Sequence, residues 1–220
     1  GEIDMSEAAD VASFIFEVNN IASLDGMNNF LNLQNLKLHN LPFLKKLEFR
    51  HLKNLVHLTC NFTPSLKSIK LDSLPVFKNL HIYDSSLDTL LLGKLESLDS
   101  LFIHETKLKT ISLDSLVLTK LTFSDNFFLK NIQLNNLERL ESLELRQNRL
   151  LEELNYSGKE NLKKLDFFDN LEITNLGLSS FKLIELLSIQ NASRIKSLEI
   201  NHLVNLENLV ISSCDSLFSM

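Results

Sequence analysis

Histidine and aromatic residues are the side chains of this sequence whose types and spacing could carry a function. Three of the six histidines, His57, His81 and His104, recur at nearly regular intervals, and Tyr83 and Phe102 lie close to them in the sequence. An imidazole can bind a metal ion, exchange a proton or form hydrogen bonds. Aromatic rings beside polar donors are typical of surfaces that bind another molecule. These five residues are therefore the first candidates for a site.

Catalysis is not indicated by the rest of the sequence. It contains no GxSxG, HExxH, phosphate-loop or paired CxxC motif, and charged residues of both signs are scattered along it. We therefore predict that the chain is not an enzyme, with no catalytic residue and no cofactor. A zinc site made by His57, His81 and His104 is not expected either, because these residues step diagonally across neighbouring strands and their nitrogens do not converge on one ion.

A repeat of two apolar residues separated by one other residue determines where these candidates lie. The step recurs at intervals of 22, 22, 21, 20, 22, 22, 22 and 22 residues after Leu36, and one interval before it lies Phe14. Alternation with a period of two predicts a strand with one inward face, and a strand in constant phase predicts parallel stacking of coils. The ten steps begin at Phe14, Leu36, Leu58, Leu80, Leu101, Leu121, Leu143, Leu165, Leu187 and Leu209.

A second apolar step follows half a repeat later. We predict a second strand in each coil, and hence a mostly β repeat solenoid of about ten coils of 20–22 residues, with parallel strands on both sides and little helix. Residues 11–220 are predicted to form one leucine-rich repeat domain, and residues 1–10 a lead-in. The second steps are 47–49, 69–71, 90–92, 111–113, 132–134, 154–156, 176–178 and 198–200.

Polar residues form a third series, five residues after the start of each first step. An amide or hydroxyl at this place can bond backbone groups where the chain leaves the strand, so the series predicts a polar ladder between coils. Leu41 and Ala192 interrupt it, and we expect distorted turns there. The members of the predicted ladder are Asn19, Thr63, Ser85, Thr106, Asn126, Asn148, Asn170 and Cys214.

The repeat resembles that of bacterial leucine-rich repeat proteins of the internalin-like type, whose unit reads LxxLxCxxNxLxxLxL. Residues 55–60 carry the Cys variant and residues 140–154 the Asn variant, and the resemblance covers roughly residues 11–220. It implies a secreted or surface-anchored bacterial protein with a non-catalytic module that binds a protein or a glycan. Gly1, Ile3 and Glu7 also resemble the second half of an EF-hand loop, but the aspartates of the first half are missing, so calcium would be held weakly.

The outward positions of the first strands are the predicted binding face. They lie one residue before, one after and three after each leading leucine, and in coils two to five they include Lys37, His39, His57, Asn61, His81, Tyr83, Phe102 and His104. We predict a binding patch made by His57, His81, Tyr83, Phe102 and His104. The alternative is an ordinary solvated strand face, because Tyr and Phe are common in strands.

Other classes of partner can be weighed from charge and composition. A net charge of −6 argues against nucleic-acid binding, and no apolar run is long enough to span a membrane. Alternative functions are a eukaryotic receptor-type or immune-receptor repeat module, or the recognition part of a larger enzyme or effector. Met220 falls in the middle of a coil, which predicts that the native chain continues or that this end self-associates. Cys60 and Cys214 lie seven coils apart, beyond disulfide reach.

Overall fold

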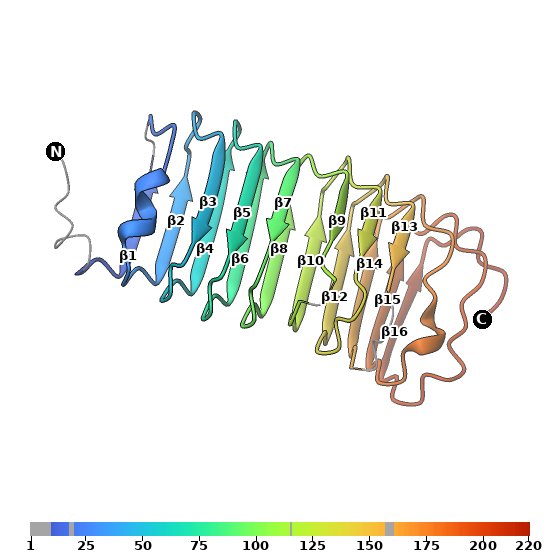
Figure 1. Ribbon diagram of the computed structural model, residues 1–220. Helices are drawn as coiled ribbons and strands as arrows, with labels where there is room; N and C mark the ends of the chain where they lie inside the picture. The colour runs from blue at the N-terminus through green and yellow to red at the C-terminus, as the bar shows by residue number, and fades with distance from the viewer. Residues whose placement is uncertain (1–9, 18–19, 115, 157–160) are drawn as a thin grey trace. The chain divides into compact units, whose positions relative to one another are not determined.

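The computed structural model describes residues 10–17, 20–114, 116–156 and 161–220. The chain divides into two compact units, residues 1–107 and residues 108–220, and each is a stack of β-coils (Figure 1). Asn19 and the EF-hand-like residues Gly1, Ile3 and Glu7 lie outside the described residues. No helix in the described ranges is long and apolar enough to cross a membrane.

The first unit contains two parallel sheets, one on each side of the coils. Leu36, Leu58, Leu80 and Leu101 are in register from strand to strand, as the repeat predicts. A 3-10 helix, η1 (Asp25–Asn29), lies between the first two strands of the chain. The larger sheet contains β1 (Ser13–Glu17), β2 (Asn35–His39), β4 (His57–Thr63), β6 (Asn79–Ser85) and β8 (Ser100–His104). The smaller sheet contains β3 (Lys46–Arg50), β5 (Ser68–Asp72) and β7 (Thr89–Leu92).

The second unit repeats this arrangement. One sheet contains β10 (Lys120–Ser124), β12 (Ser142–Arg146), β14 (Lys164–Phe168), β15 (Leu186–Gln190) and β16 (Asn208–Ser212). The other contains β9 (Thr110–Ser112), β11 (Asn131–Gln133) and β13 (Glu153–Asn155), and a short 3-10 helix, η2 (Leu178–Ser180), follows later in the chain. The predicted mostly β solenoid with parallel strands and little helix is confirmed, with about nine turns in all.

Inward leucines make the core of each unit. Leu58, Leu80 and Leu101 are at most 1% exposed, and their equivalents Leu121, Leu143 and Leu165 are as deeply buried. Each such side chain stabilises the fold by about 1.5–3 kcal/mol relative to an exposed one. The leucines of the repeat are therefore structural, and the outward residues between them are available for other roles.

Polar side chains stack between coils where the first strands end. Asn148 donates a hydrogen bond from its Nδ2 to the Phe123 carbonyl, and its Oδ1 accepts one from the backbone N–H of Asn126, in each case between buried groups of adjacent turns. Asn170 holds Asn148 in the same way through its own Oδ1. In the first unit the hydroxyl of Thr63 donates to that of Ser85 over 3.2 Å.

In the described coils from residue 40 onward, the residue before each ladder position adopts the left-handed backbone conformation, although none of these residues is glycine. The expected distortion at Leu41 and Ala192 is wrong: Asn40 and Asn191 have φ of 52°, within the range of the others, and both apolar side chains are fully buried. Asn tolerates positive φ well, so it keeps the turn regular without a polar ladder residue. The series is Asn40, Phe62, Asp84, Glu105, Asp125, Gln147, Asp169, Asn191 and Ser213.

Two of the predicted second strands do not form. Six of the eight steps become β3, β5, β7, β9, β11 and β13, whereas residues 176–178 and 198–200 form no strand. Gly177 has φ of +52° and its N–H is bonded to the Asn175 side chain, so the backbone turns there instead of extending. Near Leu198 the pairing is reduced to one bridge between Ser197 and Ser219.

Candidate binding face of the first unit

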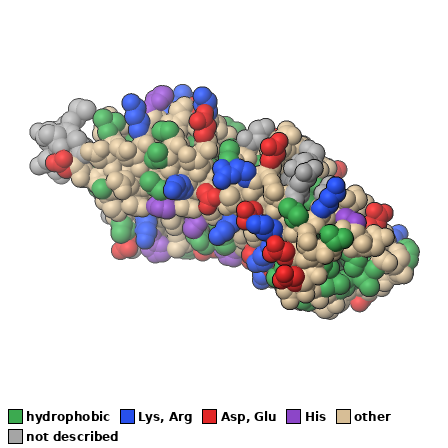
Figure 2. Space-filling model, turned by 90° about the horizontal axis from the view of Figure 1, so that it is seen from below, with side chains coloured by type: hydrophobic (Ala, Val, Ile, Leu, Met, Phe, Trp, Pro, Cys, Tyr) green, Lys and Arg blue, Asp and Glu red, His purple; other side chains and the backbone are tan. Residues whose placement is uncertain are grey.

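The five predicted residues lie on three neighbouring strands of the larger sheet of the first unit. His57 begins β4, His81 and Tyr83 lie on β6, and Phe102 and His104 lie on β8. Their neighbours in each strand are buried leucines and isoleucines, so the alternation of the strand directs these five side chains outward. Several histidine side chains gather along one margin of the surface in Figure 2.

Four of these residues form a compact cluster of rings, here called the ring block: His81, Tyr83, Phe102 and His104. Strand register places His81 beside Phe102 and Tyr83 beside His104. The centroids of Tyr83 and Phe102 are 4.8 Å apart across the diagonal, with their planes inclined at 32°. The ring of His81 lies nearly edge-on to Tyr83, with the centroids 6.2 Å apart, and is steeply tilted against Phe102, with the centroids 6.1 Å apart. The centroid of the His104 ring is 6.3 Å from that of Tyr83 and 6.3 Å from that of Phe102. These distances are typical of stabilising aromatic contacts.

His57 lies outside the ring block, but it is hydrogen-bonded to β6, the strand that carries His81 and Tyr83. The Asn79 amide on β6 donates a hydrogen bond to His57 Nδ1 over 2.7 Å. Partial burial lowers the pKa of His81, and the neighbouring His57 lowers it further. Burial likewise raises the pKa of Tyr83. Near neutral pH the block therefore presents an uncharged imidazole and an uncharged phenol, which can donate and accept hydrogen bonds without carrying a fixed charge.

Most of the equivalent positions of the second unit carry polar and charged groups instead, with Phe168 on β14 and Val210 on β16 as the exceptions. Arg146 pairs with Asp166 on the next strand, and Lys164 pairs with Glu144. On β15 the Gln190 amide donates to the Ser188 hydroxyl over 3.0 Å. Because these side chains satisfy one another, this face resembles an ordinary solvated sheet surface. The ring block is thus a local feature of β6 and β8.

The remaining predicted outward residues flank the ring block without joining it. Lys37 and His39 on β2 are exposed, and Asn61 on β4 is half-buried beside Tyr83 in the strand register. The amide of Asn61 therefore lies at one margin of the block, where it can add a polar contact to any bound molecule. Whether these residues bind a ligand stays a prediction.

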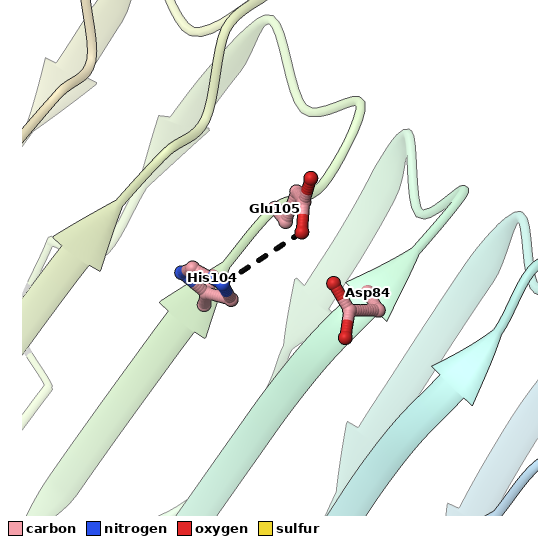
Figure 3. A group of neighbouring side chains, drawn as sticks. All are labelled: Asp84, His104 and Glu105. Atoms are coloured by element: carbon pink, nitrogen blue, oxygen red, sulfur yellow. Dashed lines mark ion pairs between the residues drawn. The ribbon is translucent and has the colours of Figure 1, made fainter.

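His104 also belongs to a group of metal-ligating side chains that the sequence did not indicate. Asp84, His104 and Glu105 each offer one ligand atom, and these atoms all lie within 4.8 Å of one another (Figure 3). His104 Nε2 is 3.8 Å from Glu105 Oε2. Asp84 and Glu105 occupy the left-handed turn position of successive coils, and that constant spacing was a signal available in the sequence. Within the described residues, no metal-ligating group combines His104 with His57 or His81.

The two cysteines do not contribute reactive thiols to this face. Cys60 is fully buried, and burial raises the pKa of its thiol to about 12. Cys214 is partly exposed, and its thiol donates to the Ile189 carbonyl over 3.6 Å. Both are free thiols. A thiol that remains protonated is a weak nucleophile, so Cys60 acts as a small apolar core residue.

No family model and no curated protein sequence matches the chain. Among solved structures, the chain is similar to an internalin, InlF, from Listeria monocytogenes, with 16% sequence identity and a TM-score of 0.27 over 99% of this chain and 88% of that one. It is also similar to the functional domain of InlJ from Listeria monocytogenes, with 14% identity and a TM-score of 0.25 over 94% of this chain and 69% of that one.

The repeat solenoid itself is shown by the parallel strands and the buried leucines of the described residues. Identities of 14–16% and TM-scores near one quarter carry no argument about what the chain does. A repeat fold accommodates many functions, so the function has to be argued from the side chains that this chain displays.

Proposed function

We propose that this chain is a non-catalytic binding module, which binds a protein or a glycan through the outward face of β4, β6 and β8. The observation that carries the proposal is the ring block, in which Tyr83 and Phe102 lie 4.8 Å apart on the outward side of a rigid sheet. We further propose that the module belongs to a secreted or surface-anchored bacterial protein, as its internalin-like repeat suggests.

The physical argument rests on how binding energy is distributed over a surface. Large aromatic side chains carry much of the affinity of an interface, because they bury a large area and lose little conformational entropy when they do so. Tyr83 and Phe102 are held by strand pairing and by ring contacts with His81 and His104, so little ordering is needed when a ligand arrives. The imidazoles and the Asn61 amide at the margin supply hydrogen-bond partners that orient the ligand.

A pair of arrays tests the proposal directly. Fluorescently labelled wild-type chain is applied to an array of immobilised glycans and to an array of cell-surface protein ectodomains. The Tyr83→Ala, Phe102→Ala double variant is compared with Phe168→Ala, a control that removes an aromatic side chain from the outward side of β14 in the second unit. Far-UV circular dichroism of all three proteins verifies that the coils are intact.

We expect wild type and the Phe168→Ala control to bind the same array members, and the double variant to lose at least about tenfold in affinity, since two anchors are removed. The array on which binding occurs distinguishes a glycan from a protein ligand. Equal binding by the double variant would remove the ring block from the binding site, and no binding to either array would count against the module itself. For the location, protease treatment of intact source cells should abolish an immunoblot signal for the chain; protection until lysis would contradict a surface position.

A further inference from the structure

The three ligand-type side chains at the end of β6 and β8 lie beside the ring block. Asp84 is the second-to-last residue of β6. His104 is the last residue of β8, and Glu105 follows it directly in the sequence. Figure 3 shows Asp84 on one strand, His104 at the end of the neighbouring strand and Glu105 just beyond it, with the three side chains at the same end of the two strands. Their ligand atoms, two carboxylate oxygens and one imidazole nitrogen, all lie within 4.8 Å of one another.

The backbone holds these residues in place from both coils. Asp84 and Glu105 have φ of 46° and 52°, so each sits in the same left-handed turn of its own coil. The Ser85 N–H donates a hydrogen bond of 3.1 Å to the Glu105 carbonyl, which ties one turn to the next. The imidazole of His104 is positioned by Tyr83 and Phe102, whose ring centroids are each 6.3 Å away. Two adjacent coils thus present the three groups at a fixed spacing.

The chemistry of the donor set selects the kind of ion. One imidazole nitrogen with carboxylate oxygens is a donor set that zinc uses, at about 2.0–2.2 Å from the metal, which puts ligand atoms roughly 3.0–3.6 Å apart. The ligand atoms of Asp84, His104 and Glu105 lie within 4.8 Å of one another, and rotation of these partly exposed side chains brings the atoms to this spacing. Calcium and magnesium prefer oxygen ligands alone and more of them, so an imidazole favours a transition-metal ion.

We propose that Asp84, His104 and Glu105 form a site for a divalent transition-metal ion, best suited to Zn²⁺. The two carboxylates offset the charge of the ion, and water completes its coordination. The Nε2 atom of His104, which lies 3.8 Å from Glu105 Oε2, binds the ion through its lone pair. The site shares His104 with the ring block, but the proposal does not depend on the proposed ligand-binding function, since Zn²⁺ can bind here whether or not the ring block binds a protein or glycan.

Isothermal titration calorimetry of the metal-stripped chain with zinc chloride tests the site. The variants are Asp84→Asn and Glu105→Gln, which keep the size of the side chain and remove its charge, and His104→Asn, which removes the imidazole. Asn is well tolerated at the left-handed turn of Asp84. His81→Asn is the matched control, because it removes a neighbouring imidazole of the same sheet face that lies outside the group. Thermal unfolding of each variant in EDTA verifies that its fold is intact.

We expect one Zn²⁺ per wild-type chain, an affinity at least about tenfold lower in each of the three variants, and an unchanged affinity in His81→Asn. Zn²⁺ should also raise the unfolding temperature of wild type but not that of His104→Asn, because the ion links two coils. The proposal is overturned if no saturable binding occurs, if binding survives all three substitutions, or if His81→Asn lowers the affinity as much as His104→Asn does. Calorimetry reads the ion directly, so its failure is distinguishable from failure of the ring block to bind a ligand.

Discussion

Replacing Asn148 with alanine should show how much the polar ladder contributes to stability. The Asn148 side chain forms three hydrogen bonds between buried groups: its Nδ2 donates to the Phe123 carbonyl over 3.0 Å, and its Oδ1 accepts from the backbone and side-chain nitrogens of Asn126, each over 3.2 Å. A hydrogen bond contributes about 1 kcal/mol net, so Asn148→Ala should lower the free energy of unfolding by about 3 kcal/mol.

Asn161→Ala provides the matched control for this substitution. The Asn161 amide also reaches back to the previous coil, where it donates to the Glu138 carbonyl, but the residue is exposed. Its loss should cost less than about 0.5 kcal/mol, because water replaces the bond. Urea unfolding followed by far-UV circular dichroism measures both, and at a slope of about 3 kcal/mol per molar the Asn148→Ala midpoint should fall by about 1 M. A cost for Asn148→Ala no larger than that for Asn161→Ala would refute the reasoning.

Four further measurements follow from other parts of the chain. Phe62 is exposed in a left-handed turn with φ of 51°, so Phe62→Gly should raise the free energy of unfolding by about 1 kcal/mol; a loss of stability in the urea assay would contradict this. In the folded chain, a thiol reagent should modify Cys214 rapidly and Cys60 only after unfolding, because burial raises the pKa of Cys60 to about 12. Mass spectrometry of the labelled protein shows how many of the two thiols have been modified. Rapid modification of both in the folded chain would be inconsistent with the buried position of Cys60. The folded-state pKa of His81 lies below its ordinary 6.5. As the pH falls, the unfolded chain therefore takes up a proton at His81 before the folded chain does, and the free energy of unfolding falls. His81→Gln should therefore weaken the loss of stability between about pH 7.5 and about pH 5.5, measured by urea unfolding, and an unchanged loss would argue against burial as the cause. Phe218 is 77% exposed close to the last strand, so sedimentation should reveal self-association that Phe218→Lys reduces; a monomer at all concentrations would disprove this.

Much of the fold could be predicted because one physical requirement recurs in every coil. An apolar residue, in nine of the ten steps a leucine, starts each apolar step of the first series, and its spacing predicted all ten strands of that series, from β1 to β16. The second series was predicted less well, since spacing alone does not reveal local backbone preferences. At residues 176–178 the left-handed Gly177 ends the extended conformation although both flanking leucines are present.

The candidate face could be predicted in part for the same reason. Since parallel register follows from the spacing of the repeat, His81 had to lie beside Phe102 and Tyr83 beside His104. The three-residue metal-type group was not predicted, because Asp84 and Glu105 lie in turns, where side chains do not alternate between two faces. The spacing of the repeat indicates that the two residues share a turn position, but the direction of their side chains depends on the left-handed backbone, which the residue types alone did not indicate.

The alternation of buried and outward residues in each first strand has a consequence for how such a chain can change over time. In β6 the inward Leu80 and Ile82 are fully buried, whereas the intervening His81 and the following Tyr83 contact mainly one another and the adjacent coil. A substitution at an outward position therefore changes the exposed surface while it leaves the core and its free energy nearly untouched. The surface of neighbouring coils can thus be rebuilt on an unchanged core, which makes the repeat a scaffold on which surface chemistry can evolve, or be engineered, a few strands at a time.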